Sequence, residues 1–460
     1  MSDAAVQDLR FSPPGPAPGP RDISPIDVLL KFASRPLEAW PRAVFETRVW
    51  RPPLPGTPIF LMDPAAIGEL FVGQAASFPQ GALWRRMMRP VWGDGMVTSE
   101  GPAWRWQRHA AAPAFRPAQM QAMAPIMARA ASAALARWPD GGRIDVAEEA
   151  GRITFDILLD VVLSGGEDFD RGGARELITG FMGELGKMRL SYYLAPDAYH
   201  EGRVTPAAPE AAELRAVIDT MIRRRRTAPP RGDLVDLLLA ARDPETGQGM
   251  DDAILRDNLL GFMVAGHETS AVALTWVLYV ATAHAPTLSR LRAEVDAVAG
   301  GQPIEAAHVP QLIFTRQVVQ EALRLYPPAH TSTRVCTRTT QVGGVTIKAG
   351  TRVLIPIYAL HRHRLWWRDP DVFDPGRFAP DQPSPDRHLY MPFGAGPRVC
   401  LGAAFAMTEL VVMLATLLRG ADFTLAAGHK VWPLADMALR PQGGMPMDVR
   451  PRPVSPSASA

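Results

Sequence analysis

The sequence predicts a mainly α fold with a smaller β-rich part, and two patterns of apolar residues support this. Segments rich in Ala, Leu and Arg repeat apolar residues every three or four positions, the period of a helix with one buried face. Short runs of β-branched and apolar residues, typical of strands, are fewer. The helical segments span 105–137, 146–163, 174–187, 209–226, 252–283, 286–299 and 313–325, and the clearest strands span 59–62, 333–336, 341–347 and 351–357.

Composition and charge exclude several classes of protein. The chain has 460 residues, of which 47% are hydrophobic and 21% charged, as in an ordinary globular protein. A net charge of +2 argues against a dedicated nucleic-acid binder. Two cysteines give no disulfide framework and fit a reducing compartment. The proline-rich N-terminus lacks the basic and apolar regions of a secretory signal, so we expect a cytoplasmic protein.

The chain is expected to have irregular ends and no membrane span. Residues 1–22 predict a proline-rich lead-in and 451–460 a disordered tail. No run of 18 apolar residues occurs, and the best candidate, 259–283, is interrupted by His267 and Glu268. Residues 363–397 are rich in proline and predict either a packed loop that positions a ligand or a linker.

The stretch FGAGPRVCLG, which begins at Phe393, is an unusual setting for a cysteine. Gly394 and Gly396 allow positive φ, and Pro397 stiffens the loop. Backbone amides and a helix from about 401 would lower the thiol pKa of Cys400. Taken alone, Cys400 would be an ordinary buried cysteine, but this loop indicates a thiolate prepared for a metal. Because no companion cysteines occur at zinc spacing, a haem iron with one axial sulfur is the natural candidate.

This stretch resembles the haem-binding signature of the cytochrome P-450 family. The family pattern is Phe, two residues, Gly, one, Arg, one, Cys, one, Gly, and it is matched by Phe393, Gly396, Arg398, Cys400 and Gly402. The resemblance implies a b-type haem whose iron is bound by the Cys400 thiolate. It also implies a single haem domain over 23–450, mainly α with a smaller β-rich lobe.

A second match is the segment EALR, in which Glu321 and Arg324 share one helical face and can pair. Such pairs are common on solvated helices and usually add little stability. Followed by LYPP, this one resembles the Glu-x-x-Arg motif of the family. The family pairs that motif with a later arginine, here Arg377 in PGRF. The implied role is structural, to lock the core that holds the cysteine loop.

The segment AGHETS, residues 265–270, places poor helix formers in the middle of a long apolar helix. It is either part of a buried helix that happens to contain a few polar residues or, by resemblance, the oxygen-activation motif of the family. The resemblance implies that Ala265 and Gly266 leave room for dioxygen. It further implies that Thr269 hydrogen-bonds the reduced oxygen and that Glu268 relays protons. His267 falls at a variable position and receives no role.

Haem carries two propionates, which need cations. Trp104 and Arg108 in WRWQR match the family's Trp-x-x-x-Arg, and Arg334 matches its propionate-binding arginine before a short strand. Individually each arginine would be a surface charge. With Arg398, the resemblance implies three arginines at the propionates.

The family fold places haem between the helix 252–283 and the Cys400 loop, and the implied reaction is monooxygenation of a hydrophobic small molecule by O2. Fatty acids, terpenoids and aromatics all fit an apolar, methionine-rich pocket. The segments that correspond to the family's pocket wall contain Trp84, Met87, Met88, Phe181, Met182, Phe262, Met263, His330 and Met445.

Electrons are expected from separate partners, a ferredoxin or flavodoxin with its reductase, because the chain ends about 60 residues after Cys400. A basic surface containing Arg362, Arg364 and Arg368 would receive them, and a monomer is expected. A haem-thiolate peroxygenase and an isomerase or dehydratase compete, but neither needs the Glu268–Thr269 pair. A non-catalytic haem sensor and a non-haem structural protein are further alternatives.

Overall fold

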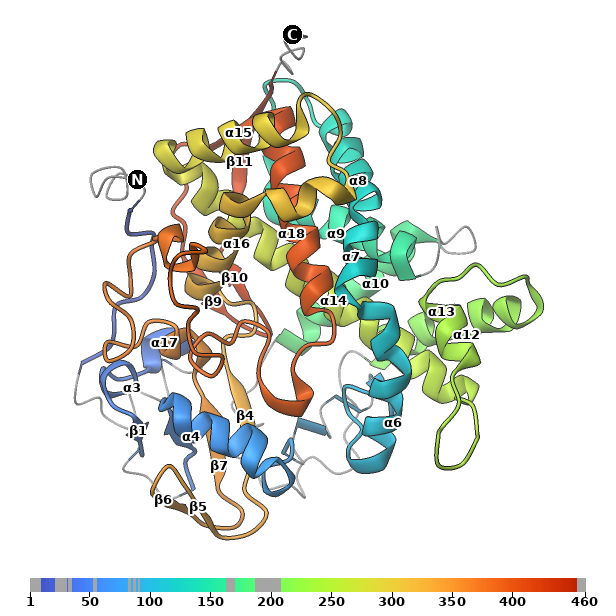
Figure 1. The fold of residues 1–460 in the computed structure, drawn as a ribbon, viewed down its shortest axis with the longest axis vertical. Helices are drawn as coiled ribbons and strands as arrows, with labels where there is room; N and C mark the ends of the chain where they lie inside the picture. Colours follow the sequence, from blue (N-terminus) through green and yellow to red (C-terminus); the bar gives the residue numbers. More distant parts are fainter. Residues whose placement is uncertain are drawn as a thin grey trace.

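The computed structural model describes residues 10–20, 31, 35–52, 56–81, 84–85, 88–89, 92–162, 170–186 and 208–452. Helices dominate, and the strands form several small sheets (Figure 1). The helices are α3 (Ala43–Glu46), α4 (Pro64–Gly68), α6 (Gly101–Ala111), α7 (Pro117–Ala122), α8 (Ala124–Arg137), α9 (Val146–Val162), α10 (Arg171–Gly186), α12 (Ala208–Thr227), α13 (Leu234–Ala240), α14 (Asp252–Ala283), α15 (Ala285–Ala299), α16 (Ile313–Leu325), α17 (Ile357–Leu360) and α18 (Ala403–Gly420).

Short strands pair segments that lie far apart in the chain. They are β1 (Val49–Trp50), β2 (Ile59–Leu61), β3 (Arg143–Asp145), β4 (Ser332–Val335), β5 (Thr340–Val342), β6 (Val345–Ile347), β7 (Arg352–Ile355), β8 (Ala421–Leu425), β9 (Pro433–Ala435), β10 (Leu439–Pro441) and β11 (Pro446–Pro451). The largest described sheet has the order β1-β2-β7-β4, in which β2 and β7 are parallel and the other pairs antiparallel. This sheet is the smaller β lobe, below the helices in Figure 1.

The helix α14 is the central element, and its sequence explains why it is long and buried. The Asp251 carboxylate caps its first turn by accepting from the Ile254 N–H at 2.7 Å. Apolar residues then face neighbours on several sides, so α14 packs against α9, α12, α16 and α18. Trp276 stacks on Tyr326 of the segment after α16, with ring centroids 3.9 Å apart. This stacking fixes the position of α14 relative to the end of α16.

Two sequence predictions about elements are wrong. The segment 105–137, expected as one helix, is divided into α6, α7 and α8. Pro113, Pro117 and Pro125 lie near the breaks, because proline lacks an N–H and fits only the first turn of a helix. The run 341–347 is a hairpin of β5 and β6, because Gly343 and Gly344 both have positive φ and form the turn.

The ends of the described chain pack on the domain. Phe11 forms a bridge with Phe373, and the Pro14 carbonyl accepts a hydrogen bond from the Tyr326 hydroxyl at 2.5 Å. Pro451, expected in the tail, pairs with Ala421 in the β11–β8 ladder. Residues 453–460 lie outside the described residues.

One described helix, α18, is long and apolar enough to cross a membrane, and 67% of its apolar window is buried inside the protein. The pair α14 and α15 passes the same test only as one segment that is bent by 108°. Burial inside the protein is the behaviour of a core helix, because such helices are hydrophobic on most faces.

Candidate active site

The middle of α14 forms one wall of a large cavity, and the AGHETS residues divide between the two sides of this helix. Ala265, Gly266 and Thr269 line the cavity. The Thr269 hydroxyl donates a hydrogen bond to the Ala265 carbonyl at 2.6 Å, so its oxygen can still accept one from a molecule in the cavity. Glu268 lines a separate cavity on the other side of α14.

Gly266 has a packing role that the sequence did not indicate. A Cβ at this position would lie 3.0 Å from the Leu158 Cδ1 atom on α9. Because α14 packs against α9, a glycine here lets the two helices approach. The space next to Thr269 is kept open by Ala265, whose short side chain is exposed to the cavity.

Cys400 lies in the loop that leads into α18, opposite α14. Its N–H donates to the Phe393 carbonyl at 2.9 Å, which closes the loop. Phe393, Cys400 and Gly402 line the same cavity as Thr269. The predicted cysteine loop and the predicted oxygen-activation motif therefore face one space.

The glycines of this loop have the backbone conformation that the sequence predicted. Gly394 and Gly396 both have φ of +72°, which strains any residue with a Cβ. At Gly396 a Cβ would also lie 2.6 Å from the Phe71 carbonyl oxygen. Gly396 thus lets the loop pack on the segment Glu69–Gly73.

The expectation of a lowered thiol pKa is wrong for the chain by itself. Burial raises the pKa of Cys400, and the Gly402 backbone and the Arg108 guanidinium oppose this only in part. The helix α18 begins at Ala403 rather than directly after the cysteine, so its positive end is more distant than expected. Coordination to a metal ion would deprotonate the thiol outright, whatever its pKa in the free chain.

Two of the predicted arginines lie at the edge of the cavity, together with the predicted tryptophan. Arg108, Arg398 and Trp104 all line it. Both guanidiniums lie over the Trp104 ring, at 5.9 Å for Arg108 and 4.7 Å for Arg398. They donate to backbone carbonyls, Arg108 to Val399 and Arg398 to Ser99. These contacts hold two cations beside the cysteine loop.

Arg334 lies beside Arg398, outside the cavity wall. Burial, and then repulsion by Arg398, lower the pKa of Arg334 to about 10. Burial also lowers the pKa values of Arg398 and Arg108. Glu100, which attracts Arg334 and Arg398, is itself paired with Arg85 at 2.9 Å. Half-buried cations that repel each other fit a ligand with two carboxylates, such as the haem propionates.

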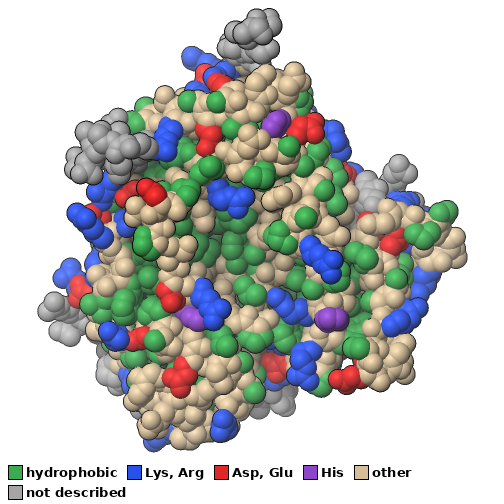
Figure 2. Space-filling model, in the orientation of Figure 1, with side chains coloured by type: hydrophobic (Ala, Val, Ile, Leu, Met, Phe, Trp, Pro, Cys, Tyr) green, Lys and Arg blue, Asp and Glu red, His purple; other side chains and the backbone are tan. Residues whose placement is uncertain are grey.

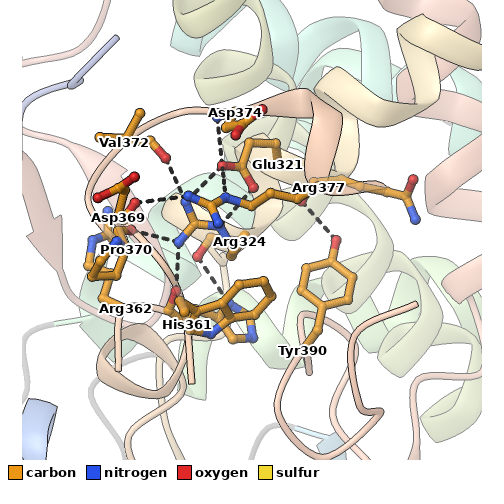
Figure 3. Close-up of polar contacts among 12 residues, drawn as sticks. Glu321, Arg324, His361, Arg362, Asp369, Pro370, Val372, Asp374, Arg377 and Tyr390 are labelled. Atoms are coloured by element: carbon orange, nitrogen blue, oxygen red, sulfur yellow. Dashed lines mark hydrogen bonds and ion pairs between the residues drawn. The ribbon is translucent and has the colours of Figure 1, made fainter. Parts of the chain in front are cut away.

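The predicted Glu321–Arg324 pair is buried and forms the centre of a network (Figure 3). Both side chains are 0% exposed, and two guanidinium nitrogens of Arg324 each lie 2.7 Å from a Glu321 oxygen. The remaining Arg324 donors bind the carbonyls of His361, Pro370 and Val372 at 2.7–2.9 Å. One helix side chain therefore organises a long irregular segment.

Arg377 joins this network as predicted, through a longer contact. Its Nε lies 3.3 Å from Glu321 Oε1, and the Asp374 N–H donates to the same oxygen at 2.8 Å. Its guanidinium also donates to the Asp369 carbonyl at 2.9 Å. The proline-rich segment 363–397 is thus a packed loop and not a linker.

The sequence did not indicate the role of His361. This ring accepts at Nε2 from the Met391 N–H at 2.8 Å, so Nδ1 carries the proton and donates to the Arg324 carbonyl at 3.0 Å. Burial, reinforced by Arg324, lowers the pKa of His361 to about 3, which keeps the ring neutral. His361 therefore links the network to Met391, two residues before the cysteine loop.

Of the residues predicted for the substrate pocket, Phe262 lines the cavity and the other described ones do not. Phe262 lines the cavity, but Met263, the next residue of α14, faces the core because it lies 100° further around the helix. Met88 and Met445 are fully buried core residues. Trp84 packs against Trp92, and His330 Nε2 contacts the Asp436 carbonyl at 2.8 Å. Met87 and the side chains of Phe181 and Met182 lie outside the described residues.

The helix α9 is a part of the cavity wall that the sequence analysis missed, and it adjoins the loop before α6, which belongs to the segment 80–97 expected at the pocket. Leu158 and Val161, one helical turn apart on α9, line the cavity with Met96 and Val97. The loop is pinned to α14, because the Met96 N–H donates to Asn258 Oδ1 at 2.9 Å. The helical spacing on α9 was visible in the sequence, but its direction relative to α14 was not.

The expected docking arginines differ in their exposure. Arg362 is 4% exposed and lies over the Tyr358 ring at 3.9 Å, so it is unavailable to a partner. Arg364 pairs with Asp371 at 2.7 Å, whereas the Arg368 side chain is 92% exposed. Figure 2 shows basic side chains around an apolar hollow on the face where the loop before α18 lies.

Comparison with known proteins identifies the class that this fold and site define. The family model "Cytochrome P450" matches residues 49–445. The chain therefore belongs to the cytochrome P450 family.

Named relatives and solved structures agree with this assignment. The chain is 33% identical to the cyclooctat-9-en-7-ol 5-monooxygenase of Streptomyces melanosporofaciens over 74% of either chain. It is 30% identical to the leukotriene-B4 omega-hydroxylase 3 of Mus musculus, over 93% of this chain and 86% of that one. A crystal structure of a cytochrome P450, CYP102L1, superposes with a TM-score of 0.79 at 27% identity, covering 96% of this chain and all of that one. The protein is a P450 monooxygenase with a cysteine-ligated haem.

We expect Cys400→Ala to abolish the thiolate signature of the haem. The substitution leaves the described cavity wall without a cysteine sulfur that could bind the iron, while Phe393 and the loop backbone remain. The measurement is the difference spectrum of the reduced protein with and without carbon monoxide. Cys336 is a buried cysteine in the β lobe. The variant Cys336→Ala is therefore the control and should keep the strongly red-shifted band. A red-shifted band in Cys400→Ala would contradict the ligand assignment.

We expect Glu321→Gln to destabilise the fold by about 3–5 kcal/mol, because it leaves the Arg324 cation buried without its carboxylate. The measurement is the free energy of unfolding from denaturant titration, together with the yield of haem-loaded protein. Asp448→Ala, which removes a solvent-exposed ion pair with Arg143, is the control and should change the unfolding midpoint little. Equal effects of the two substitutions would show that the Glu321 network is not structural.

Proposed function

We propose that this P450 hydroxylates a hydrophobic small molecule in the cytoplasm, using O2 and two electrons from separate redox proteins. One oxygen atom of O2 enters a C–H bond of the substrate, and the other leaves as water with two protons from solvent. The observation that carries this proposal is the continuous apolar wall that runs from Cys400 past Ala265 to Phe262.

The proposed roles of the residues follow from their positions. Bound haem would supply the activation of O2. Cys400 would hold it from the α18 side, and Arg108 and Arg398 would neutralise its propionates. Thr269 would face the same space from the α14 side. Because its own proton is directed at the Ala265 carbonyl, Thr269 would accept from a protonated oxygen and so stabilise it.

The substrate would be held by shape and by exclusion of water. The described wall over Thr269 consists mainly of Phe262, Leu158, Val161 and Val97. Phe262 is itself supported by the Phe115 ring, whose centroid is 5.5 Å away. Such a pocket selects apolar ligands by desolvation and leaves few polar groups to fix their orientation. The names of two relatives, which refer to cyclooctat-9-en-7-ol and to leukotriene B4, support a cyclic or long-chain hydrophobic substrate.

The redox partner would dock on the face that carries the loop before α18. Basic side chains surround an apolar hollow there (Figure 2), and exposed Arg368 belongs to the loop organised by Arg324. An acidic partner such as a ferredoxin or flavodoxin fits this charge.

We expect Thr269→Ala to uncouple turnover. Reductant should still be consumed, but product per reductant should fall by about tenfold or more and hydrogen peroxide should accumulate. The measurement is the ratio of product to reductant in the reconstituted enzyme. Thr282→Ala is the matched control, because Thr282 makes the same bond to a carbonyl four residues back on α14 and lies outside the cavity. Normal coupling in Thr269→Ala would refute the oxygen-activation role.

We expect Phe262→Ala to weaken substrate binding at least about tenfold, because a buried aromatic side chain contributes about 1.5–3 kcal/mol. The measurement is a spin-state titration with a panel of fatty acids, cyclic terpenoid alcohols and aromatics. Met263→Leu, which changes the adjacent core residue, is the control and should bind like the wild type. If no member of the panel shifts the spin state of the wild type, the proposed substrate class is wrong.

A further inference from the structure

A second cavity, of about 600 Å3, lies on the side of α14 opposite the haem cavity. Its walls come from α9, α10, α14 and the segment that follows β9. From α14 it is lined by His267, Glu268, Ala271, Val272 and Thr275. His267 and Ala271 lie on the face of the helix opposite Ala265 and Thr269, whereas Glu268 and Val272 lie toward the boundary between the two faces. One helix thus separates two cavities of different character.

His267 is the unexplained residue of this cavity. It is 3% exposed, and neither ring nitrogen has a hydrogen-bond partner in the part of the chain that the structure describes. The Phe155 ring packs on it edge-to-face at 5.4 Å, and the Gly151 backbone approaches it without hydrogen-bonding geometry. A buried imidazole without partners is costly, so the two nitrogens call for a polar occupant of the cavity.

The charges around the cavity are balanced, which favours water over an ion. Arg440 is paired with Asp436 at 2.6 Å, and Arg152 from α9 is paired with Glu148 and Glu149. The α10 wall adds one cation and one anion, Arg175 and Glu176. With both signs present on three walls, a cavity of this size is suited to a hydrogen-bonded cluster of water molecules.

Glu268 connects this cavity to the reaction. Its carboxyl group lines the polar cavity, and the next residue, Thr269, lines the haem cavity. Burial raises the pKa of Glu268, with Arg440 opposing and Asp436 reinforcing the shift. A raised pKa brings the carboxyl group closer to the pH range in which it can both take up and release a proton.

We propose that His267 is a positioning residue for the proton relay through Glu268 that the family resemblance implies, and that it holds the water chain of the polar cavity that leads to Glu268. This inference rests on the proposed monooxygenation, which consumes two protons per turnover. A proton enters from solvent, passes along the water chain to a Glu268 oxygen, and leaves on the Thr269 side, so that Glu268 returns to its starting state.

His267 would orient the chain and would not itself carry the proton. Burial, with a further contribution from Arg175, lowers the pKa of His267 to about 4, so the ring is neutral at physiological pH. A neutral imidazole offers one donor and one acceptor, which is what a residue needs to fix the direction of a water chain. Any side chain of similar size with one donor and one acceptor should replace it.

The test compares His267→Phe with His267→Gln in the haem-loaded enzyme. Phenylalanine keeps the packing on Phe155 and removes both nitrogens, whereas glutamine restores a donor and an acceptor. We expect His267→Phe to lower product per reductant by about tenfold and to enlarge the solvent deuterium isotope effect, and His267→Gln to recover most of the coupling. Haem content, the carbon monoxide spectrum and substrate spin-state titration should stay unchanged in both variants.

A readout independent of turnover is the titration of the His267 ring by nitrogen-15 NMR of the carbon monoxide complex. We expect the His267 ring to be neutral above pH 5. Its nitrogen signals are assigned by their disappearance from the spectrum of His267→Gln. Equal coupling in His267→Phe and wild type would overturn the inference, as would an equal loss in both variants, since that is the sign of a packing role. Thr269→Ala separates the two proposals: if it stays coupled, the proposed monooxygenation mechanism fails. If it uncouples while His267→Phe does not, only the inference fails.

Discussion

The fold around the cysteine depends on one buried ion pair, between Glu321 and Arg324. Neither side chain reaches solvent, and an isolated charge at that depth would cost several kcal/mol. The cost is offset because all the oxygens and nitrogens involved find partners, most of them backbone groups of residues 361–374. The pair thus turns a proline-rich segment with little regular structure into a rigid support. Through His361 and Met391 this support extends to the loop that presents Cys400.

The helix α14 has a second organising role, as a partition. Within the AGHETS segment, Ala265, Gly266 and Thr269 face the apolar cavity, and His267 and Glu268 face the polar one. This division separates two requirements that conflict in a single space: apolar ligands need a dry site, and proton transfer needs water. A helix can meet both because adjacent residues point 100° apart. The motif AGHETS reads as one unit in the sequence but serves two sides of a wall.

Sequence patterns were informative wherever a residue's role follows from its neighbours along the chain. The long helices, the glycine conformations of the cysteine loop and the Glu321–Arg324 pair are of this kind. The residues that form the cavity were harder, because Phe262 and Met263 are equally apolar and only tertiary packing decides which one faces the cavity. Likewise β8 to β11 gave no clear signal, since each is short and paired with a distant segment. The pKa of Cys400 was misjudged because burial depends on the whole fold.

Gly266 shows how a residue without a side chain can set the dimensions of the site. It lies where α14 packs against α9, and the atom that an added side chain would meet belongs to Leu158, which also lines the haem cavity. Any larger residue must therefore either lift α14 from its neighbour or rotate Leu158 into the space above the cofactor. The absence of a Cβ at Gly266 thus determines how closely α14 and α9 can pack. The clearance available to a substrate is therefore set in part by the contact between α14 and α9, on the far side of the cavity wall.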